Sequence, residues 1–331
     1  MPTTPSTENQ CAGTVLMVRP ATFYAHPETV ASNSFQHVAD GPGAATLAAA
    51  QSEFDGVAKA LATVGVQVAA IEADSASDTP DALFPNNWFS THADGQVVLY
   101  PMAVPSRRRE RRPELITNLA ASYGLRITHS TDLTHLEERN LIVEGTGSLV
   151  LDRSARIAYA CLSPRTHEAA VRIACKAVGY EALVFSAHGS DGRSIYHTNV
   201  MMSVGPAVAV ICGDLIRDGT ARRRVLDSLE RTHHAILEIS AGQVEAFAGN
   251  ILFLDGGATG TVVAISRRAW QSLAVTQRRQ LERYAQPAIC VVDTIEGTGG
   301  GGIRCMLAEV FLPLQSHASD FRLSTRGGAA T

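Results

Sequence analysis

Several features that would place this chain in a common class are missing. It has no apolar run near the ~18 residues that a membrane-spanning helix needs, and its polar first segment, residues 1–13, lacks the apolar core of a secretory signal. Only 18% of its 331 residues are charged, with 28 basic against 32 acidic side chains. The net charge of −4 argues against a nucleic acid or an anionic membrane as partner. We therefore expect a cytoplasmic protein that binds neither.

Motifs for metals and nucleotides are also missing. The sequence has no CxxC or HxxxH pair at metal-ligand spacing, no Lys-Ser/Thr follows its glycine run as a phosphate-binding loop requires, and no GxGxxG leads from a strand into a helix. We expect no metal and no cofactor. The six cysteines are expected to be reduced thiols, and the 45% of hydrophobic residues indicate a globular protein with a sizeable core.

What the sequence does contain is an internal repeat. Between residues 45 and 285, an amphipathic helix is followed by a short β-branched strand, a turn-rich segment and a second apolar strand. The expected helices cover residues 47–64, 113–123, 164–178 with Ser163 as N-cap, 214–233 and 266–284. The strands expected after them are Val66–Ile71, Leu125–Thr128, Ala182–Phe185, Ala235–Ile239 and Ala288–Val292.

Each repeat unit contains a polar or glycine-rich stop ahead of an apolar strand. The residues at these stops are Asn87, Glu144, His197, Asn250 and Cys305, separated by 57, 53, 53 and 55 residues. A period near 55 with one helix per unit is typical of a closed ring of α/β modules. A further strand at Thr14–Val18 would complete the last unit and remove exposed sheet edges. In such a ring the five stop residues face one axis and form an active site.

Cys305 is the candidate nucleophile among these residues. It follows Gly297-Thr298-Gly299-Gly300-Gly301-Gly302, a run tolerated mainly where the backbone is strained or lies close to a ligand, and whose N–H groups could form an oxyanion site. Arg304 could lower the pKa of the thiol. His197 is the expected general acid and base, and Glu144 supplies a carboxylate ahead of a buried strand. A buried structural cysteine and a surface turn at Glu144 are the plain alternatives.

These segments and their order resemble the pentein superfamily, which contains arginine deiminases, dimethylarginine hydrolases and amidinotransferases. Its deiminases carry F-x-R-D, E-G-G-D, S-x-R-T and H-x-D segments and a late glycine-rich loop that ends in Cys. The matching segments here are Phe84-Pro85-Asn86-Asn87, Glu144-Gly145-Thr146-Gly147, Ser163-Pro164-Arg165-Thr166, His197-Thr198-Asn199 and Gly299 to Cys305. The resemblance implies a five-fold pseudosymmetric α/β propeller that forms one domain over residues 1–331.

The resemblance also implies roles for individual side chains. Cys305 would attack the substrate carbon, His197 would act as acid and base, and Glu144 would hold a substrate nitrogen. Arg165 would bind the α-carboxylate of an amino acid, a role that suits a guanidinium. Further substrate-binding residues are expected at Asn86, Asn87 and Asn199.

Three aspartates of the deiminase pattern are replaced here, by Asn87, Gly147 and Asn199. A guanidinium has only donors and needs anionic acceptors, whereas a neutral ureido group offers a carbonyl oxygen as well as N–H donors and therefore suits asparagine. The closest agreement is with citrulline-utilisation hydrolases, in the segments FPNNWFSTH, EGTGS, HTNVMM and RCMLAE. This predicts hydrolysis of L-citrulline to ornithine, ammonia and carbon dioxide through a thiocarbamoyl-type intermediate.

Other interpretations stay open at this stage. The first is an arginine deiminase, dimethylarginine hydrolase or amidinotransferase acting on a guanidino group, and the second is a non-catalytic ring such as a ribosome-binding translation factor. The basic cluster at residues 107–112 is interpreted as a solvated helix start. Residues 1–12 and 315–331 are expected to be flexible termini, and a homodimer stays open because no sequence feature fixes the oligomeric state.

Overall fold

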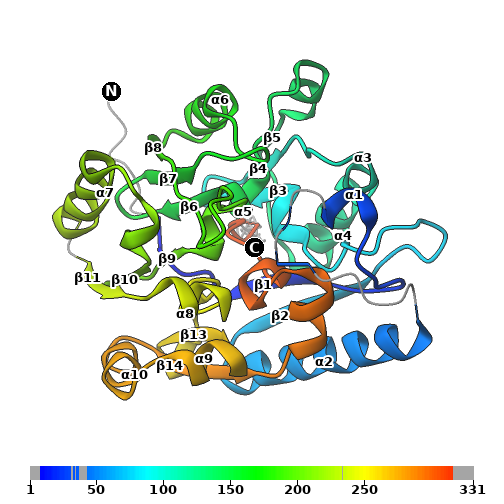
Figure 1. The fold of residues 1–331 in the computed structure, drawn as a ribbon. Helices are drawn as coiled ribbons and strands as arrows, with labels where there is room; N and C mark the ends of the chain where they lie inside the picture. Colours follow the sequence, from blue (N-terminus) through cyan, green and yellow to red (C-terminus); the bar gives the residue numbers. More distant parts are fainter. Residues whose placement is uncertain (1–7, 31–32, 34, 37–42, 233, 316–331) are drawn as a thin grey trace, which may run out of the picture.

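Five three-stranded sheets surround a common centre, with the long helices on the outside (Figure 1). The computed structural model describes residues 8–30, 33, 35–36, 43–232 and 234–315. The architecture is the five-fold pseudosymmetric α/β propeller that the repeat predicted. Residues 316–331 of the expected C-terminal tail lie outside the described part of the chain.

Each sheet repeats one topology. In the third unit β6 (Leu149–Asp152) pairs antiparallel with β7 (Ile157–Cys161), and β7 pairs parallel with β8 (Glu181–Phe185). A short turn suffices for the antiparallel pair, whereas the parallel pair needs a crossover, which α6 (Glu168–Val178) supplies on the outside of the ring. The inner strand of every unit therefore begins near the ring axis.

The other units differ mainly in the lengths of their helices. The second unit consists of β3 (Phe89–Thr91), β4 (Gln96–Leu99), α3 (Pro105–Arg108), α4 (Pro113–Tyr123) and β5 (His129–Asp132). The fourth consists of β9 (Met202–Val204), β10 (Val208–Ile211), α7 (Gly219–Arg231) and β11 (Ala235–Glu238). The fifth consists of α8 (Ala241–Glu245), β12 (Leu252–Asp255), β13 (Thr261–Ser266), α9 (Arg267–Ser272), α10 (Val275–Glu282) and β14 (Gln286–Cys290).

The remaining sheet joins the two ends of the chain, as predicted. Its central strand β1 (Thr14–Arg19) pairs antiparallel with β15 (Ala308–Glu309) and parallel with β2 (Gln67–Glu72), which follows α2 (Ala44–Thr63). A short helix, α1 (Pro27–Val30), follows β1. The turn that carries Cys305 leads directly into β15, so the position of the cysteine depends on the N-terminal strand.

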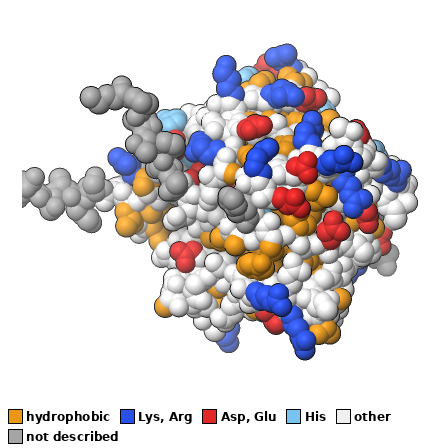
Figure 2. Space-filling model, turned by 90° about the vertical axis from the view of Figure 1, so that its left-hand side faces the viewer, with side chains coloured by type: hydrophobic (Ala, Val, Ile, Leu, Met, Phe, Trp, Pro, Cys, Tyr) orange, Lys and Arg blue, Asp and Glu red, His pale blue; other side chains and the backbone are white. Residues whose placement is uncertain are grey.

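The core lies between the sheets and the outer helices. Every residue of β7 and β10 is buried, as expected for strands covered on both faces. The helix α6 buries Ala170, Val171, Ala174, Cys175 and Val178, at spacings of one, three and four that align them on one face. None of the helices in the described part of the chain is long and apolar enough to cross a membrane. On the face seen in Figure 2, basic and acidic side chains are interspersed.

Residues 8–12 are packed, which contradicts their assignment to a flexible terminus. Glu8 is buried and binds Arg153 (Oε1 to Nη1, 2.9 Å) and the hydroxyl of Tyr180 (Oε2, 2.6 Å). The side chain of Gln10 donates to the carbonyl groups of Leu151 and Val204. These contacts anchor the start of the chain to the third and fourth units.

Some element boundaries differ from the predicted ones. Ser163 does not cap a helix, because Ser163 and Thr166 exchange backbone hydrogen bonds in a tight turn and α6 starts only at Glu168. The fourth helix starts at Gly219 rather than 214, because the Asp218 side chain accepts from the N–H groups of Thr220 and Ala221 as an N-cap. The predicted fifth helix is divided into α9 and α10, and the strand predicted at 125–128 lies at His129–Asp132.

Replacing Glu8 by Ala is expected to lower the free energy of unfolding by about 3 kcal/mol, because removing one partner of a buried ion pair leaves the other charge uncompensated. Arg153 would keep only Glu309, at 3.6 Å. Urea unfolding measures the change. The control Glu230→Ala, at an exposed position of α7, should stay within about 0.5 kcal/mol of the parent. Equal effects of both substitutions would contradict the anchoring role of Glu8.

Candidate active site

The five stop residues lie at equivalent places in the five units. Each precedes the inner strand of its sheet: Asn87 precedes β3, Glu144 precedes β6, His197 precedes β9, Asn250 precedes β12 and Cys305 precedes β15. All five side chains are buried. Short turns aim them inward, among them the 3-10 turns Pro85–Asn87, Thr198–Val200 and Ile303–Met306 and the single-turn helix α5 (Gly145–Ser148). The structure therefore places the five stop residues at equivalent, inward positions of the ring, as the repeat predicted.

Glu144 and His197 form a buried pair. Nε2 of His197 lies 2.7 Å from Oε2 of Glu144, whose Oε1 accepts from the backbone N–H of Ala103 at 2.9 Å. Burial acts to raise the pKa of Glu144, but Arg165 (Nη1 to Oε2, 3.5 Å) and His197 outweigh it and lower the pKa to about 2. Because an ionised carboxylate only accepts, the proton of the imidazole lies on Nε2.

Burial keeps His197 neutral at physiological pH. Burial lowers its pKa to about 4, and the opposing effect of Glu144 does not restore it. With Nε2 protonated, Nδ1 carries a lone pair and can take up a proton. His197 is thus oriented as a base.

Cys305 lies against two asparagine amides. Nδ2 of Asn250 is 3.3 Å from Sγ and Nδ2 of Asn199 is 3.8 Å from it. Burial raises the pKa of the Cys305 thiol, although Asn250 and the neighbouring Arg304 act in the opposite direction. Arg304 acts to lower the pKa of the thiol, as expected, but burial outweighs this effect. Its guanidinium points away from the sulfur, to the carbonyl of Leu307 and the carboxylate of Glu309.

Two glycines are required by the geometry of the site. Gly300 has φ +62, and a Cβ there would approach Asn33 and Gln36 to 2.7 Å. A Cβ on Gly147 would lie 2.4 Å from Nδ2 of Asn87 and 2.8 Å from Nδ1 of His197. Gly147, which takes the place of an aspartate in the deiminase pattern, is therefore the space into which these two side chains fit.

Asn87 presents a free amide donor to the cavity beside Cys305. Arg107 donates from Nη1 to Oδ1 of Asn87 at 2.7 Å, and because a guanidinium only donates, this contact fixes Nδ2 as the other atom of the amide. Among the described residues Nδ2 has no hydrogen-bond partner. The asparagine therefore has an unused N–H₂ group close to His197.

The other predicted asparagines are placed differently. Asn199 lies behind the thiol, where Nδ2 donates to the carbonyl of Thr146 and Oδ1 accepts from Asn250, so the protein itself uses its polar atoms. The side chain of Asn86 is fully buried next to Asn87 but is not part of the cavity wall. The structure therefore brings Asn87 and Arg165, but not Asn86 and Asn199, to the cavity.

Two cavity residues had no role in the sequence-based prediction. Arg107, assigned to a solvated helix start, is buried and forms an ion pair with Glu110 (Nη2 to Oε2, 2.9 Å). Asp81 is buried on the same wall, where burial raises its pKa against the effects of Arg107 and Arg165. A basic run and a lone acid in a loop carry no periodic signal, so tertiary contact alone identifies them.

The cavity combines charges of both signs with the candidate nucleophile. About 270 Å³ of space is bounded by Asp81, Arg107, Arg165, Asn87, His197 and Cys305, with the glycine loop 299–301 on one side. Two guanidinium groups and a carboxylate beside a thiol and a neutral imidazole can hold a zwitterion and attack an attached carbonyl-type carbon. In the described part of the chain, no group of three His, Cys, Asp or Glu side chains is placed to hold a metal ion.

A ring of five modules with Cys, His and Glu at equivalent positions defines a pentein hydrolase. The family described as N,N dimethylarginine dimethylhydrolase, eukaryotic, matches residues 19–312, and the chain belongs to this family. It is therefore a hydrolase that acts on carbon–nitrogen bonds. No curated relative matches the chain in sequence.

Solved structures with the same fold are distant in sequence. The N-terminal domain of ArgZ, an arginine dihydrolase from cyanobacteria, has a TM-score of 0.69 and 15% identity over 91% of this chain and 99% of its own. AgrE in complex with L-arginine has a TM-score of 0.68 and 15% identity over 92% of this chain and 41% of its own. A dimethylarginine dimethylaminohydrolase adduct with S-methyl-L-thiocitrulline has a TM-score of 0.62 and 13% identity over 90% and 99%.

Replacing Gly147 by Ala should reduce kcat/KM about 100-fold or more, because the new Cβ displaces Asn87 and His197, and a displacement of ~1 Å at reacting groups can cost ~100-fold. Steady-state kinetics and thermal unfolding measure the effect. The control is Gly297→Ala, where a Cβ meets no atom within 4 Å. Parent-like kinetics in Gly147→Ala would contradict the prediction, because they would show that Asn87 and His197 can move without loss of activity.

Proposed function

We propose that the enzyme hydrolyses the ureido group of L-citrulline to ornithine, ammonia and carbon dioxide. The observation that carries the proposal is the free amide donor of Asn87, fixed by Arg107 beside His197. A ureido oxygen can accept from this donor, whereas a guanidinium would bring an N–H group against it. The buried donor and a guanidinium would then both stay unsatisfied, which is costly.

The rest of the cavity supports an amino acid as substrate. Arg165 and Arg107 supply the positive charge for an α-carboxylate, and Asp81 supplies the negative charge for an α-ammonium group. Glu144 has lone pairs beyond those that Ala103 and His197 use, so that it can accept from a ureido N–H. A neutral ureido group then needs no further anion at the reacting end.

The proposed reaction starts from a protonated thiol and a neutral imidazole, as the pKa directions indicate. Cys305 transfers its proton to Nδ1 of His197, and its sulfur forms a bond to the ureido carbon while Asn87 stabilises the oxygen. His197 returns the proton to the departing nitrogen as the C–N bond breaks, which leaves a thiocarbamoyl group on Cys305. Water, deprotonated by His197, displaces the sulfur and gives a carbamate. Its breakdown releases carbon dioxide and the second amine.

The comparisons support a covalent route and an amino-acid substrate. An ArgZ variant is covalently bound to a reaction intermediate, and a dimethylarginine dimethylaminohydrolase forms an adduct with S-methyl-L-thiocitrulline. AgrE binds L-arginine, and in another complex ornithine. These proteins and the family description favour a guanidino substrate as the second candidate. It would bind in the same cavity, where Glu144 and Asp81 would supply the negative charges.

A substrate panel is expected to separate the two candidates. Citrulline, arginine, methylarginines and carbamoyl amino acids are incubated with the enzyme, and ammonia and ornithine are measured. Citrulline should be turned over fastest, and Cys305→Ala should remove the activity. Faster turnover of arginine or a methylarginine would overturn citrulline as the substrate.

Replacing Asn87 by Asp should lower kcat/KM for citrulline by about 10- to 100-fold, because the oxygen of the ureido group then faces a carboxylate instead of a donor, a change of about 1.4–2.7 kcal/mol. The ratio of arginine to citrulline turnover should rise. Asn87→Ala is the control: it removes the donor without adding a charge, so it should slow citrulline but raise the ratio less than Asn87→Asp does. An unchanged ratio in Asn87→Asp would contradict the role of the Asn87 donor.

A further inference from the structure

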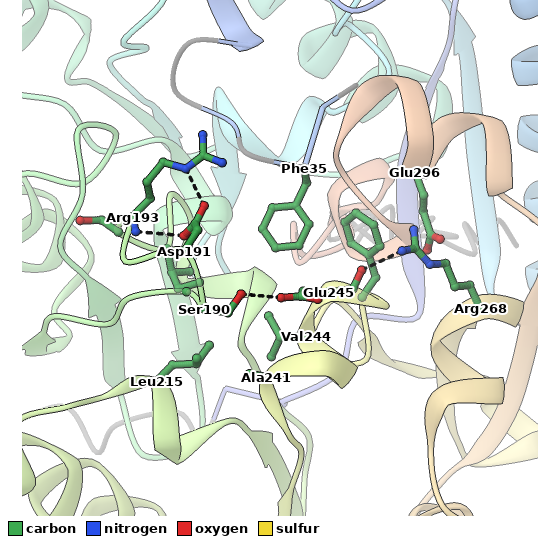
Figure 3. A pocket seen from close by; sticks show the side chains of 14 residues that line it. Phe35, Ser190, Asp191, Arg193, Leu215, Ala241, Val244, Glu245, Arg268 and Glu296 are labelled. Atoms are coloured by element: carbon green, nitrogen blue, oxygen red, sulfur yellow. Dashed lines mark hydrogen bonds and ion pairs between the residues drawn. The ribbon is translucent and has the colours of Figure 1, made fainter. Parts of the chain in front are cut away.

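A second cavity lies next to the catalytic one and shares none of its lining residues. It encloses about 900 Å³ of space that opens to solvent, between the loop 189–195, the helix α8 and the turn that contains Glu296 (Figure 3). Its floor is apolar, with Ile195, Leu215 and Val244. The rings of Phe35 and Phe247 pack 5.3 Å apart on one side. A flexible apolar stem would fit this floor.

This space is called the second cavity from here on, and one of its walls carries the buried carboxylate of Glu296. Glu296 is 1% exposed, and Ser266 and Arg268 lie near its carboxylate, but among the described residues neither oxygen has a hydrogen bond of normal geometry. The other two acids of the cavity are engaged, Asp191 with Arg193 and Glu245 with Ser190. A buried carboxylate with so little compensation is costly, and a cation that binds it would reduce this cost.

Organic cations suit this wall better than metal ions do. A divalent ion needs several oxygen ligands around it, and among the cavity residues that the structure describes the other two carboxylates are already engaged. Arg268 stands beside Glu296, 5.6 Å above the ring of Phe247 and donating to the carbonyl of Glu245 at 3.0 Å. A ligand cation next to Arg268 would share the carboxylate with it, and the stem of the ligand would face the ring of Phe247.

The second cavity is also connected to the catalytic loop. Glu296 belongs to the single π-helical turn Ile295–Gly299, and its carbonyl accepts from the N–H of Gly300 at 3.1 Å. Phe35 packs on Tyr196 with ring centroids 5.9 Å apart, and the hydroxyl of Tyr196 donates to the carbonyl of Gly300 at 2.7 Å. A molecule between Glu296 and Phe35 therefore contacts Glu296, which binds Gly300, and Phe35, which packs on Tyr196, the other partner of Gly300. Gly300 borders the catalytic cavity.

We propose that the second cavity is an effector site for a small organic cation, an amine or a guanidine on an alkyl stem of a few carbons. The cationic group binds Glu296, the stem lies over Phe247 and the apolar floor, and occupancy acts on turnover through the loop at Gly300. Such a ligand needs neither an α-carboxylate nor an α-ammonium group, which separates it from a substrate held by Arg165 and Asp81.

The affinity should depend on pH in one direction. Burial raises the pKa of Glu296 to about 7; the hydroxyl of Ser266 and the charge of Arg268 act against this, while Asp293 and Glu53 of α2 act with it. The carboxyl is therefore mostly neutral at pH 6 and mostly ionised at pH 8. A cation binds the ionised form, so that affinity rises across this range and then levels off.

The test is calorimetric titration with n-butylguanidine at pH 6 and pH 8. The parent should bind one equivalent, several-fold more tightly at pH 8. Glu296→Gln, which keeps the shape and loses the charge, should weaken binding at least tenfold at pH 8 and remove the pH dependence. The matched control Glu245→Gln alters a carboxylate of the same cavity that is already hydrogen-bonded and should change the Kd less than threefold.

A second variant guards against misfolding of the first. Ala241→Leu, at the partly exposed start of α8, fills the cavity without touching Glu296 and should also weaken binding. At saturating n-butylguanidine, kcat or KM of the parent for its best substrate should change at least twofold, and those of Glu296→Gln should not. Absence of binding, binding that is insensitive to Glu296→Gln, or binding with unchanged kinetics would each overturn the proposal.

Discussion

The site depends on one carboxylate that stays ionised inside the protein. Glu144 is fully buried, and a lone charge there would be prohibitively costly. Its partners come from different parts of the ring: a backbone N–H after β4, the imidazole ahead of β9, and the guanidinium of Arg165 after β7. The negative charge in turn orients His197 and leaves Nδ1 as a base. Loss of any one of these three partners would therefore leave the buried charge less compensated.

The cavity combines two kinds of group. Arg107, Arg165 and Asp81 carry full charges of both signs, which suit the carboxylate and the ammonium group of a zwitterion. Asn87 and Cys305 supply a neutral amide and a thiol whose pKa burial raises. Strong binding of the invariant part of an amino acid can thus position a weakly polar group at the sulfur, where no permanent charge is needed.

The sequence predicted the site residues that recur at equivalent positions of the repeat, and it missed those that occur in one unit only. A period near 55 residues placed Asn87, Glu144, His197, Asn250 and Cys305 together, because equivalent residues of a closed ring must face the same axis. Arg107 and Asp81 could not be found in this way, since each occurs in one unit only. Asn199 and Asn86 are assigned to substrate binding by the resemblance alone. Thr146 and Asn250 occupy the polar atoms of Asn199, and the fold encloses the side chain of Asn86.

The pairing of β1 with β15 has a consequence for how the enzyme is made. The strand that receives the last segment is synthesised first, and it keeps one open edge until residues near 308 emerge from the ribosome. Cys305 reaches its asparagine neighbours only at that moment. An incomplete chain would therefore carry the imidazole and the carboxylate without the thiol. On the proposed mechanism, activity would begin only when β15 pairs with β1.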